Sequence, residues 1–144
     1  MKDLNINCTN PSNQQLNNLL KCYQTGRYID AEKLSLSITK EFPEHPFAWK
    51  VLGIVLKKTG KINEALVVNQ KSAQLEPMNM ETNFNLGNTL QELGRLEEAE
   101  TCYRKAISIK PDYVEAHNNL GVTLQRIGRL EEAETCYRKA ISIK

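Results

Sequence analysis

Side chains that bind metals or carry redox chemistry are few in this sequence and widely spaced. The chain has four cysteines and two histidines, which are Cys8, Cys22, Cys102, Cys136, His45 and His117. The cysteines form no Cys-x-x-Cys pair and the histidines lie far from them, so a zinc site is not favoured. Cys102 and Cys136 are 34 residues apart, which is the period of an internal repeat of this sequence. They therefore fall on equivalent helices of two repeats. Such helices lie about 10 Å apart or more, beyond the reach of a disulfide. We therefore predict reduced structural thiols, with no metal and no cofactor.

Carboxylates that could act as a general acid and a general base occur in two clusters, Glu97-Glu98-Glu100 and Glu131-Glu132-Glu134. The solvated first turns of helices commonly carry such glutamates, because negative charge is favoured at a helix N-terminus. The sequence contains no phosphate-binding loop, no nucleophile elbow and no Ser/His/Asp arrangement. We therefore predict no catalytic residues and expect that the chain is not an enzyme.

The bulk charge does not point to nucleic acid or membrane. Nineteen basic and seventeen acidic side chains give a net charge of +2, which is too small to indicate either partner. The first 15 residues are polar and rich in asparagine, unlike a signal peptide, and no run approaches the roughly 18 apolar residues of a membrane span. We expect a cytoplasmic protein.

The elements that position these side chains follow from an internal repeat. The stretch GRLEEAETCYRKAISIK occurs at 94–110 and again, unchanged, at 128–144. More divergent copies keep the 34-residue step through Pro43, Pro77 and Pro111, and through Gly26, Gly60, Gly94 and Gly128. Four repeats result, and they follow a flexible N-terminal tail (1–11): 12–45, 46–79, 80–113 and 114–144.

Each repeat is predicted to form two helices. The first runs from Met80 to Leu93 in the third repeat, where Gly94 supplies a left-handed cap. The second begins with glutamates, closes with bases such as Lys110, and is blocked by Pro111. Small residues permit close packing: we expect Gly87 to lie against Ala99 of the second helix. Tyr103 and Tyr137 are then core fillers directed toward the next repeat, and His117 is a packed core histidine.

The set Leu86-Gly87, Leu90, Gly94, Ala99, Tyr103, Ala106 and Pro111 resembles the tetratricopeptide repeat signature, and the resemblance covers residues 12–144. It implies an all-α fold, a right-handed solenoid of stacked helix–turn–helix repeats. The repeats are similar to those of O-linked N-acetylglucosamine transferase-like proteins. The uninterrupted 34-residue step argues against the 35-residue pentatricopeptide repeat of RNA-binding proteins.

Two repeats depart from this pattern. The first has Leu19 where the family has glycine and Ile38 where it has alanine, so it should pack differently. The second has Asn69 at the aromatic position and Ser72 at the alanine position. Buried polar groups need partners, so we expect the weakest joint between the second and third repeats.

The resemblance also implies a concave groove, lined by the first helix of each repeat, that receives a peptide. The predicted groove residues are Asn17, Lys50, Ile54, Lys57, Phe84, Asn85, Asn88, Gln91, Asn118, Asn119, Val122 and Gln125. Asn17, Asn85 and Asn119 share one repeat position, and a row of amides can hydrogen-bond a peptide backbone without reading its side chains. We favour such a row, and the alternative is a generic repeat face, because asparagine is also common at this position in the family.

We therefore predict a scaffold that binds a protein or peptide, with no nucleic-acid or membrane partner. The alternative is a substrate-recruiting arm of a larger glycosyltransferase- or sulfotransferase-type enzyme whose catalytic domain is absent. Leu16 and Leu20 replace the lysine and asparagine that a carboxylate clamp for chaperone tails needs. RNA binding is not favoured, because the groove lysines are accompanied by Glu81, Glu92 and Glu115.

The sequence stops at Lys144, in the second helix of the fourth repeat. We expect that this uncapped repeat exposes part of its stacking surface. The side chains concerned are Leu124, Leu130, Tyr137 and Ile141. A homodimer through two such surfaces is the expected result, with fraying of the last repeat as the alternative.

Overall fold

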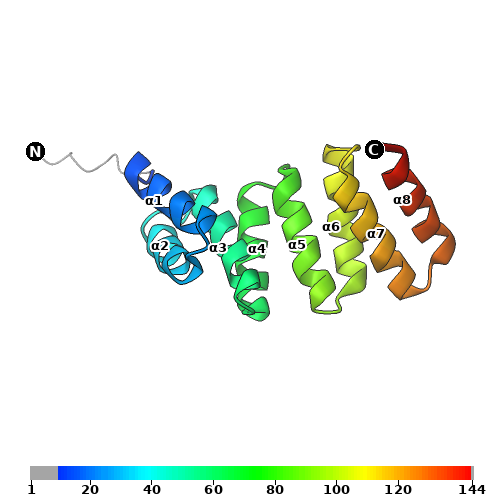
Figure 1. Cartoon of the computed structure of the whole chain (residues 1–144), viewed down its shortest axis with the longest axis horizontal. Coiled ribbons are helices and arrows are strands. Elements are labelled where there is room, and N and C mark those ends of the chain that lie inside the picture. The colour runs from blue at the N-terminus through cyan, green and yellow to red at the C-terminus, as the bar shows by residue number, and fades with distance from the viewer. Residues whose placement is uncertain (1–9, 144) are drawn as a thin grey trace, which may run out of the picture. The chain divides into compact units, whose positions relative to one another are not determined.

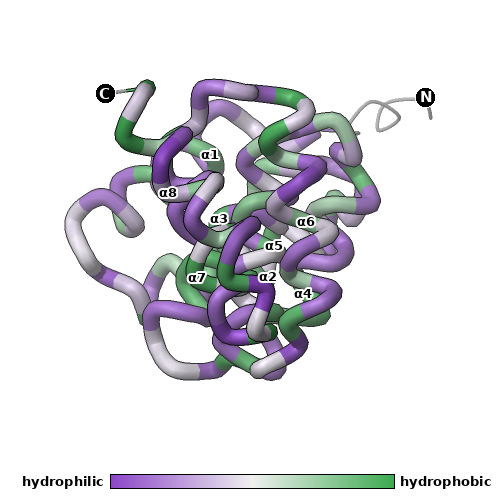
Figure 2. Tube along the Cα trace, turned by 90° about the vertical axis from the view of Figure 1, so that its right-hand side faces the viewer, coloured by the Kyte–Doolittle hydropathy of each residue, from purple (hydrophilic) through white to green (hydrophobic). Residues whose placement is uncertain are grey.

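The computed structural model describes residues 10–143, and this part of the chain forms eight α-helices and no strand (Figure 1). Their bounds are α1 Asn13–Gln24, α2 Tyr28–Glu41, α3 Pro46–Lys58, α4 Ile62–Leu75, α5 Met80–Glu92, α6 Leu96–Ile109, α7 Val114–Ile127 and α8 Leu130–Ile143. Hydrophilic and hydrophobic residues are interspersed along the helices (Figure 2). None of the described helices is long and apolar enough to cross a membrane. Cys8 and most of the predicted tail lie outside the described residues.

The chain divides into two compact units, which meet in sequence between Leu75 and Glu76. Unit 1 contains α1–α4 and unit 2 contains α5–α8. The boundary falls at the joint between the second and third repeats, which the sequence predicted to be the weakest. Near it, the Ser72 hydroxyl on α4 is buried and has no hydrogen-bond partner among the described residues.

The turn between paired helices depends on glycine. Gly94, which separates α5 from α6, has φ +79°, and Gly128, between α7 and α8, has φ +98°. Residues other than glycine rarely adopt this left-handed backbone conformation, so the predicted left-handed caps are confirmed. The predicted acids also lie in the first turn of α6, as Glu97 and Glu98. The last turn of α6 holds no base, however, because Lys110 is the residue that caps the helix.

The close approach inside each unit 2 repeat involves an aromatic ring and not the predicted alanine. A Cβ atom on Gly87 would lie 2.8 Å from Cε1 of Tyr103, and a Cβ atom on Gly121 would lie 2.7 Å from Cε1 of Tyr137. Ala99 is buried but is not the neighbour that requires glycine. Tyr103 therefore packs first against its own repeat, where it is fully buried.

Unit 1 uses larger aliphatic side chains at the positions where the first repeat departs from the family pattern. Leu19 and Ile38 are 0% and 1% exposed and belong to one core cluster with Ala48, Val51 and Val55 of α3. The N-terminus of α1 is fixed by a capping box, in which Ser12 Oγ accepts from the Gln15 backbone N–H and Gln15 Oε1 accepts from the Ser12 backbone N–H. Because α1 and α2 carry bulk in place of glycine and alanine, their pairing is specific to this repeat.

The surface of the last repeat differs in one residue from the sequence prediction. Leu130 and Ile141 on α8 are 62% and 73% exposed, and Tyr137 is half-buried. Leu124, which we expected to share this surface, is fully buried. It lies on α7, where it belongs to the interior of unit 2, and was therefore wrongly assigned to the stacking surface.

Candidate binding surface

Unit 2 brings together eight of the predicted groove residues on the two helices that begin its repeats, α5 and α7. On α5, Asn85, Asn88 and Gln91 follow one another at three-residue steps, and Phe84 lies four positions before Asn88, so each pair shares one side of the helix. All four are half-buried. On α7, Asn118 and Asn119 are half-buried, while Val122 and Gln125 are exposed.

Asn88 is the centre of a hydrogen-bond network that links α5, α6 and α7. Its Oδ1 atom accepts from the Tyr103 hydroxyl at 2.6 Å and from Asn119 Nδ2 at 2.8 Å. Burial raises the pKa of Tyr103 well above its ordinary value, so the hydroxyl remains a donor at neutral pH. The Asn88 and Asn119 amides are therefore held in fixed orientations.

Gln91 uses both ends of its amide in the same network. Its Nε2 donates to Thr123 Oγ1 at 2.8 Å and to the Asn119 carbonyl at 3.2 Å. Its Oε1 lies 3.2 Å from the Tyr103 hydroxyl. Gln91 is thus mainly a structural link between neighbouring repeats, although the sequence placed it in the groove.

The fourth repeat has a reduced form of this network. Gln125 is the equivalent of Gln91, and its Oε1 accepts from the Tyr137 hydroxyl at 2.9 Å. Val122 stands where the third repeat has Asn88, so it offers no acceptor to Tyr137. An apolar side chain, 41% exposed, takes its place on the surface.

Two side-chain amides on these helices have no hydrogen-bond partner in the described part of unit 2. The side chains of Asn85 on α5 and Asn118 on α7 make no hydrogen bond with any residue in the described part of unit 2. Each amide offers donors and an acceptor. Asn85 lies three positions before Asn88 on α5, and Asn118 directly precedes Asn119 on α7. They are the groups on this surface most suited to an external partner.

Phe84 has a structural partner beyond the predicted groove. Its ring lies 4.8 Å from the Tyr113 ring in an edge-to-face arrangement and 5.9 Å from the Tyr103 ring. Such aromatic pairs contribute beyond their burial. Phe84 therefore anchors the aromatic cluster of unit 2, and only part of its ring remains available to a ligand.

The remaining predicted groove residues lie in unit 1. Asn17 is exposed on α1, whereas Lys50, Ile54 and Lys57 are half-buried on α3. Lys58, their neighbour, places Nζ 5.9 Å from the centre of the Tyr28 ring. The row of three asparagines is thus divided between the units, with Asn85 and Asn119 together in unit 2.

Sequence reasoning missed a hydrogen bond that attaches the first helix of a repeat to the turn before it. The fourth residue of the repeat bonds the carbonyl of the proline six positions earlier. Trp49 Nε1 donates to Pro43 at 2.9 Å and Asn83 Nδ2 donates to Pro77 at 3.0 Å. His117 Nε2 lies 2.8 Å from the Pro111 carbonyl, so its imidazole is the packed side chain predicted, at 7% exposed. The constant spacing to proline was the signal available in the sequence.

The glutamate clusters that suggested acid–base chemistry are ion-paired in unit 2. Arg129 contacts Glu100 at 2.8 Å and Glu132 at 2.7 Å, and Arg95 contacts Glu98 at 2.7 Å. Hydrogen bonds from the arginines lower the pKa of Glu98 and Glu132 below the ordinary value. A general acid needs the opposite shift, so these carboxylates serve as surface ion pairs.

The described cysteines and acids do not assemble a metal site. No group of three potential ligands occurs within residues 10–143, and Cys22, Cys102 and Cys136 are free thiols. Burial raises the pKa of Cys102 to about 11 and also raises that of Cys136. Thiols with raised pKa values are poor nucleophiles, which fits a packing role.

Comparisons with known proteins agree with this architecture. Residues 79–144 match the family model of the tetratricopeptide repeat. A solved structure of MamA AMB-1 is 26% identical, with a TM-score of 0.80, and the match covers 89% of this chain and 70% of that one. MamA 41-end from Desulfovibrio magneticus RS-1 is 22% identical, with a TM-score of 0.82 and coverage of 87% and 71%. No curated protein sequence shows significant similarity to the chain. The predicted all-α fold of helical repeats is confirmed.

Proposed function

We propose that the chain is a non-catalytic interaction module of the tetratricopeptide type, which binds an extended peptide of a partner protein across α5 and α7. The observation that carries this proposal is the amide network of unit 2. Asn88 Oδ1 accepts from both Tyr103 and Asn119, which fixes the surface, while the Asn85 and Asn118 amides have no partner within the described residues of the unit.

An amide can donate to a backbone carbonyl and accept from a backbone N–H at once, so it suits a peptide of any sequence. Holding the neighbouring side chains in place before binding reduces the entropy lost on association. The half-buried Phe84 and the exposed Val122 add apolar contact beside the amides. The amides of this surface therefore bind the backbone of a peptide, and the apolar residues beside them select only weakly among its side chains.

The experiment uses peptides selected from a random library on the intact chain, with affinities measured by calorimetry. Asn85→Ala should weaken binding about fivefold, because one neutral hydrogen bond contributes on the order of 1 kcal/mol. Thr101→Ala is the matched control, since Thr101 is an exposed neutral residue on α6 whose hydroxyl bonds only the Glu97 carbonyl. Equal affinity of wild type and Asn85→Ala for every selected peptide would refute the proposal.

Asn119→Ala is a less direct test of the same surface. Asn119 Nδ2 donates to Asn88 within the protein, so its loss changes the surface as well as the peptide contact. The alternative role, as the substrate-recruiting arm of a larger enzyme, would use the same residues and predicts the same effect of Asn85→Ala.

Self-association through the last repeat is a second proposal, supported by the exposed face of α8. Leu130 and Ile141 are 62% and 73% exposed, and their spacing of 11 residues, about three helical turns, places them on one face. Their equivalents in the third repeat, Leu96 and Ile107, are half-buried. This face is exposed on α8, and we propose that a second copy of the chain covers it.

A further inference from the structure

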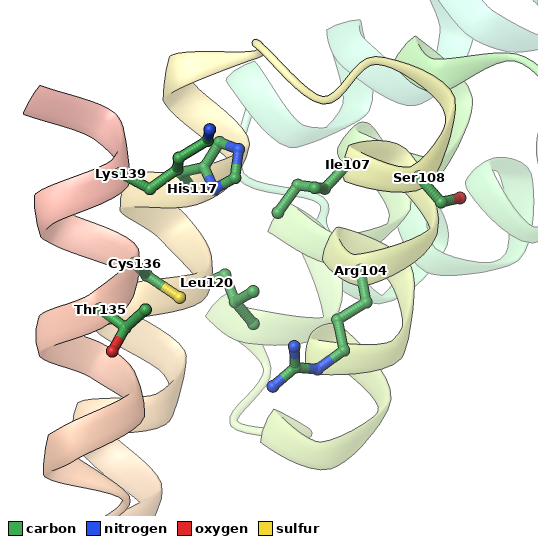
Figure 3. A pocket seen from close by; sticks show the side chains of 8 residues that line it. All are labelled: Arg104, Ile107, Ser108, His117, Leu120, Thr135, Cys136 and Lys139. Atoms are coloured by element: carbon green, nitrogen blue, oxygen red, sulfur yellow. The ribbon is translucent and has the colours of Figure 1, made fainter. Parts of the chain in front are cut away.

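A cavity of about 370 Å³ lies in unit 2 between α6, α7 and α8 (Figure 3). Its wall includes Ile107 from α6, Leu120 and His117 from α7, and Cys136 and Lys139 from α8. Arg104 of α6 also lines it. None of these residues belongs to the α5 and α7 binding surface described above, so the cavity is separate from the proposed peptide site.

In unit 1, a tryptophan side chain packs at the position that corresponds to this cavity. The residues 68 positions earlier are Trp49 for His117, Leu52 for Leu120, Val68 for Cys136 and Lys71 for Lys139. Trp49 packs on the cluster that contains Leu52 and Val68, and Lys71 Nζ lies 5.9 Å from the centre of the indole ring. An aromatic ring is therefore the occupant that this arrangement of residues holds in the other unit.

Trp49 and His117 each contact the carbonyl of the proline six positions earlier. Trp49 Nε1 donates to the Pro43 carbonyl at 2.9 Å, and His117 Nε2 lies 2.8 Å from the Pro111 carbonyl. Imidazole and the five-membered ring of indole have the same size, so the anchored rings correspond. What His117 lacks is the fused six-membered ring, and its Nδ1–Cε1 edge takes the place of the fused edge.

We propose that this cavity binds a planar aromatic ring of indole size, which enters beside His117 and lies beneath Lys139. Part of the bound ring takes the place of the six-membered ring that Trp49 supplies in unit 1, and the rest lies in the open part of the cavity. A ring N–H of the ligand can donate to His117 Nδ1, which is an acceptor when Nε2 donates to the Pro111 carbonyl.

The charges around the cavity favour the face of an aromatic ring. Lys139 forms no ion pair with the residues described in unit 2, whereas Arg104 is held by Glu100 at 2.9 Å and by Glu132 at 3.3 Å. An ammonium group over a ring face is attracted by the ring quadrupole. Burial raises the pKa of the Cys136 thiol, so this wall is a neutral, polarisable surface at physiological pH.

The test is a titration of the intact chain with indole, followed by NMR and calorimetry, with N-acetyltryptophanamide as the probe for a tryptophan side chain of a partner. We expect saturable binding of indole at one site, with a Kd of about 0.1–1 mM, as for a small ligand in a partly open pocket. Binding of the amide as well would identify a polypeptide side chain as the natural occupant. Binding of indole alone would identify a small molecule.

Two reciprocal variants make the test specific. His117→Trp should fill the cavity and weaken indole binding at least tenfold, and Cys136→Phe blocks the same cavity from α8 if the first variant is unstable. Trp49→His should open the corresponding place in unit 1 and raise the stoichiometry from one to two. Peptide binding across α5 and α7 should be unchanged in His117→Trp, so failure of one proposal is distinguishable from failure of the other.

Alkylation of Cys136 gives an independent readout. The tryptic peptide LEEAETCYR is identical for Cys102 and Cys136, so the measurement uses a Cys102→Ser background in which the two peptides differ in mass. Saturating indole should slow Cys136 alkylation severalfold and leave Cys22 unaffected. No saturation at several millimolar indole, or equal binding by wild type and both cavity-filling variants, would overturn the proposal.

Discussion

At the scale of single residues, we assign Asn85 to peptide binding and Asn88 to the stability of the fold. They lie three positions apart on α5 and are both half-buried asparagines. Asn88 Oδ1 accepts two hydrogen bonds within unit 2, whereas the Asn85 side chain accepts none from the described residues of that unit. The two residues are therefore matched in type and location but differ in their contacts.

Asn88→Ala should lower the free energy of unfolding by about 1–3 kcal/mol, because it removes the main acceptor of a buried tyrosine hydroxyl and a partner of Asn119. Asn85→Ala should change it by less than about 0.5 kcal/mol, because the Asn85 side chain makes no hydrogen bond with the described residues of unit 2. Urea unfolding followed by circular dichroism measures both. Equal losses in the two variants would contradict the assigned division of roles.

At the scale of elements, α4 differs from α6 and α8 at two buried packing positions. It carries Asn69 where α6 and α8 carry Tyr103 and Tyr137, and Ser72 where they carry alanine. The Ser72 hydroxyl is buried with no partner in the described structure, and a buried unsatisfied polar group costs about 1–3 kcal/mol.

Ser72→Ala should therefore raise the free energy of unfolding by about 1 kcal/mol or more. Ser35 on α2 provides the control, since it is equally buried but its hydroxyl donates to the Ala31 carbonyl. Ser35→Ala removes that bond and should give no such gain. Thermal or urea unfolding of the two variants decides, and a loss of stability in Ser72→Ala would show that the hydroxyl has a partner in solution.

At the scale of the whole molecule, self-association depends on the open face of α8. We expect light scattering to show a dimer at micromolar to high micromolar concentration, and Leu130→Glu with Ile141→Glu to give a monomer of unchanged helicity. The reason is the cost of placing charge in an apolar contact. Val67→Glu is the matched control, because Val67 is 65% exposed on α4 and lies outside this face. A strict monomer of the wild type at several hundred micromolar would contradict dimerisation.

The sequence alone determined the helical elements and their order, since the 34-residue step fixed where each glycine turn and proline lies. The positive φ of Gly94 and Gly128 and the bounds of α5 and α6 follow from local chemistry. The packed role of His117 was also predictable, because the family usually carries a large side chain at this position of the repeat. In the second, third and fourth repeats this residue lies six positions beyond a proline.

Only the tertiary structure decided which side chains meet across helices. It assigned the close approach of Gly87 to Tyr103 instead of Ala99 and placed Leu124 in the interior. It also divided the predicted groove amides between those that bond one another and those, such as Asn85, that do not. Repeat position fixes the helix face on which a residue lies, but a hydrogen bond requires distances and angles that depend on how neighbouring helices pack. The cavity beside His117 follows in the same way, because it exists only where the surrounding helices keep the space that an indole fills in unit 1.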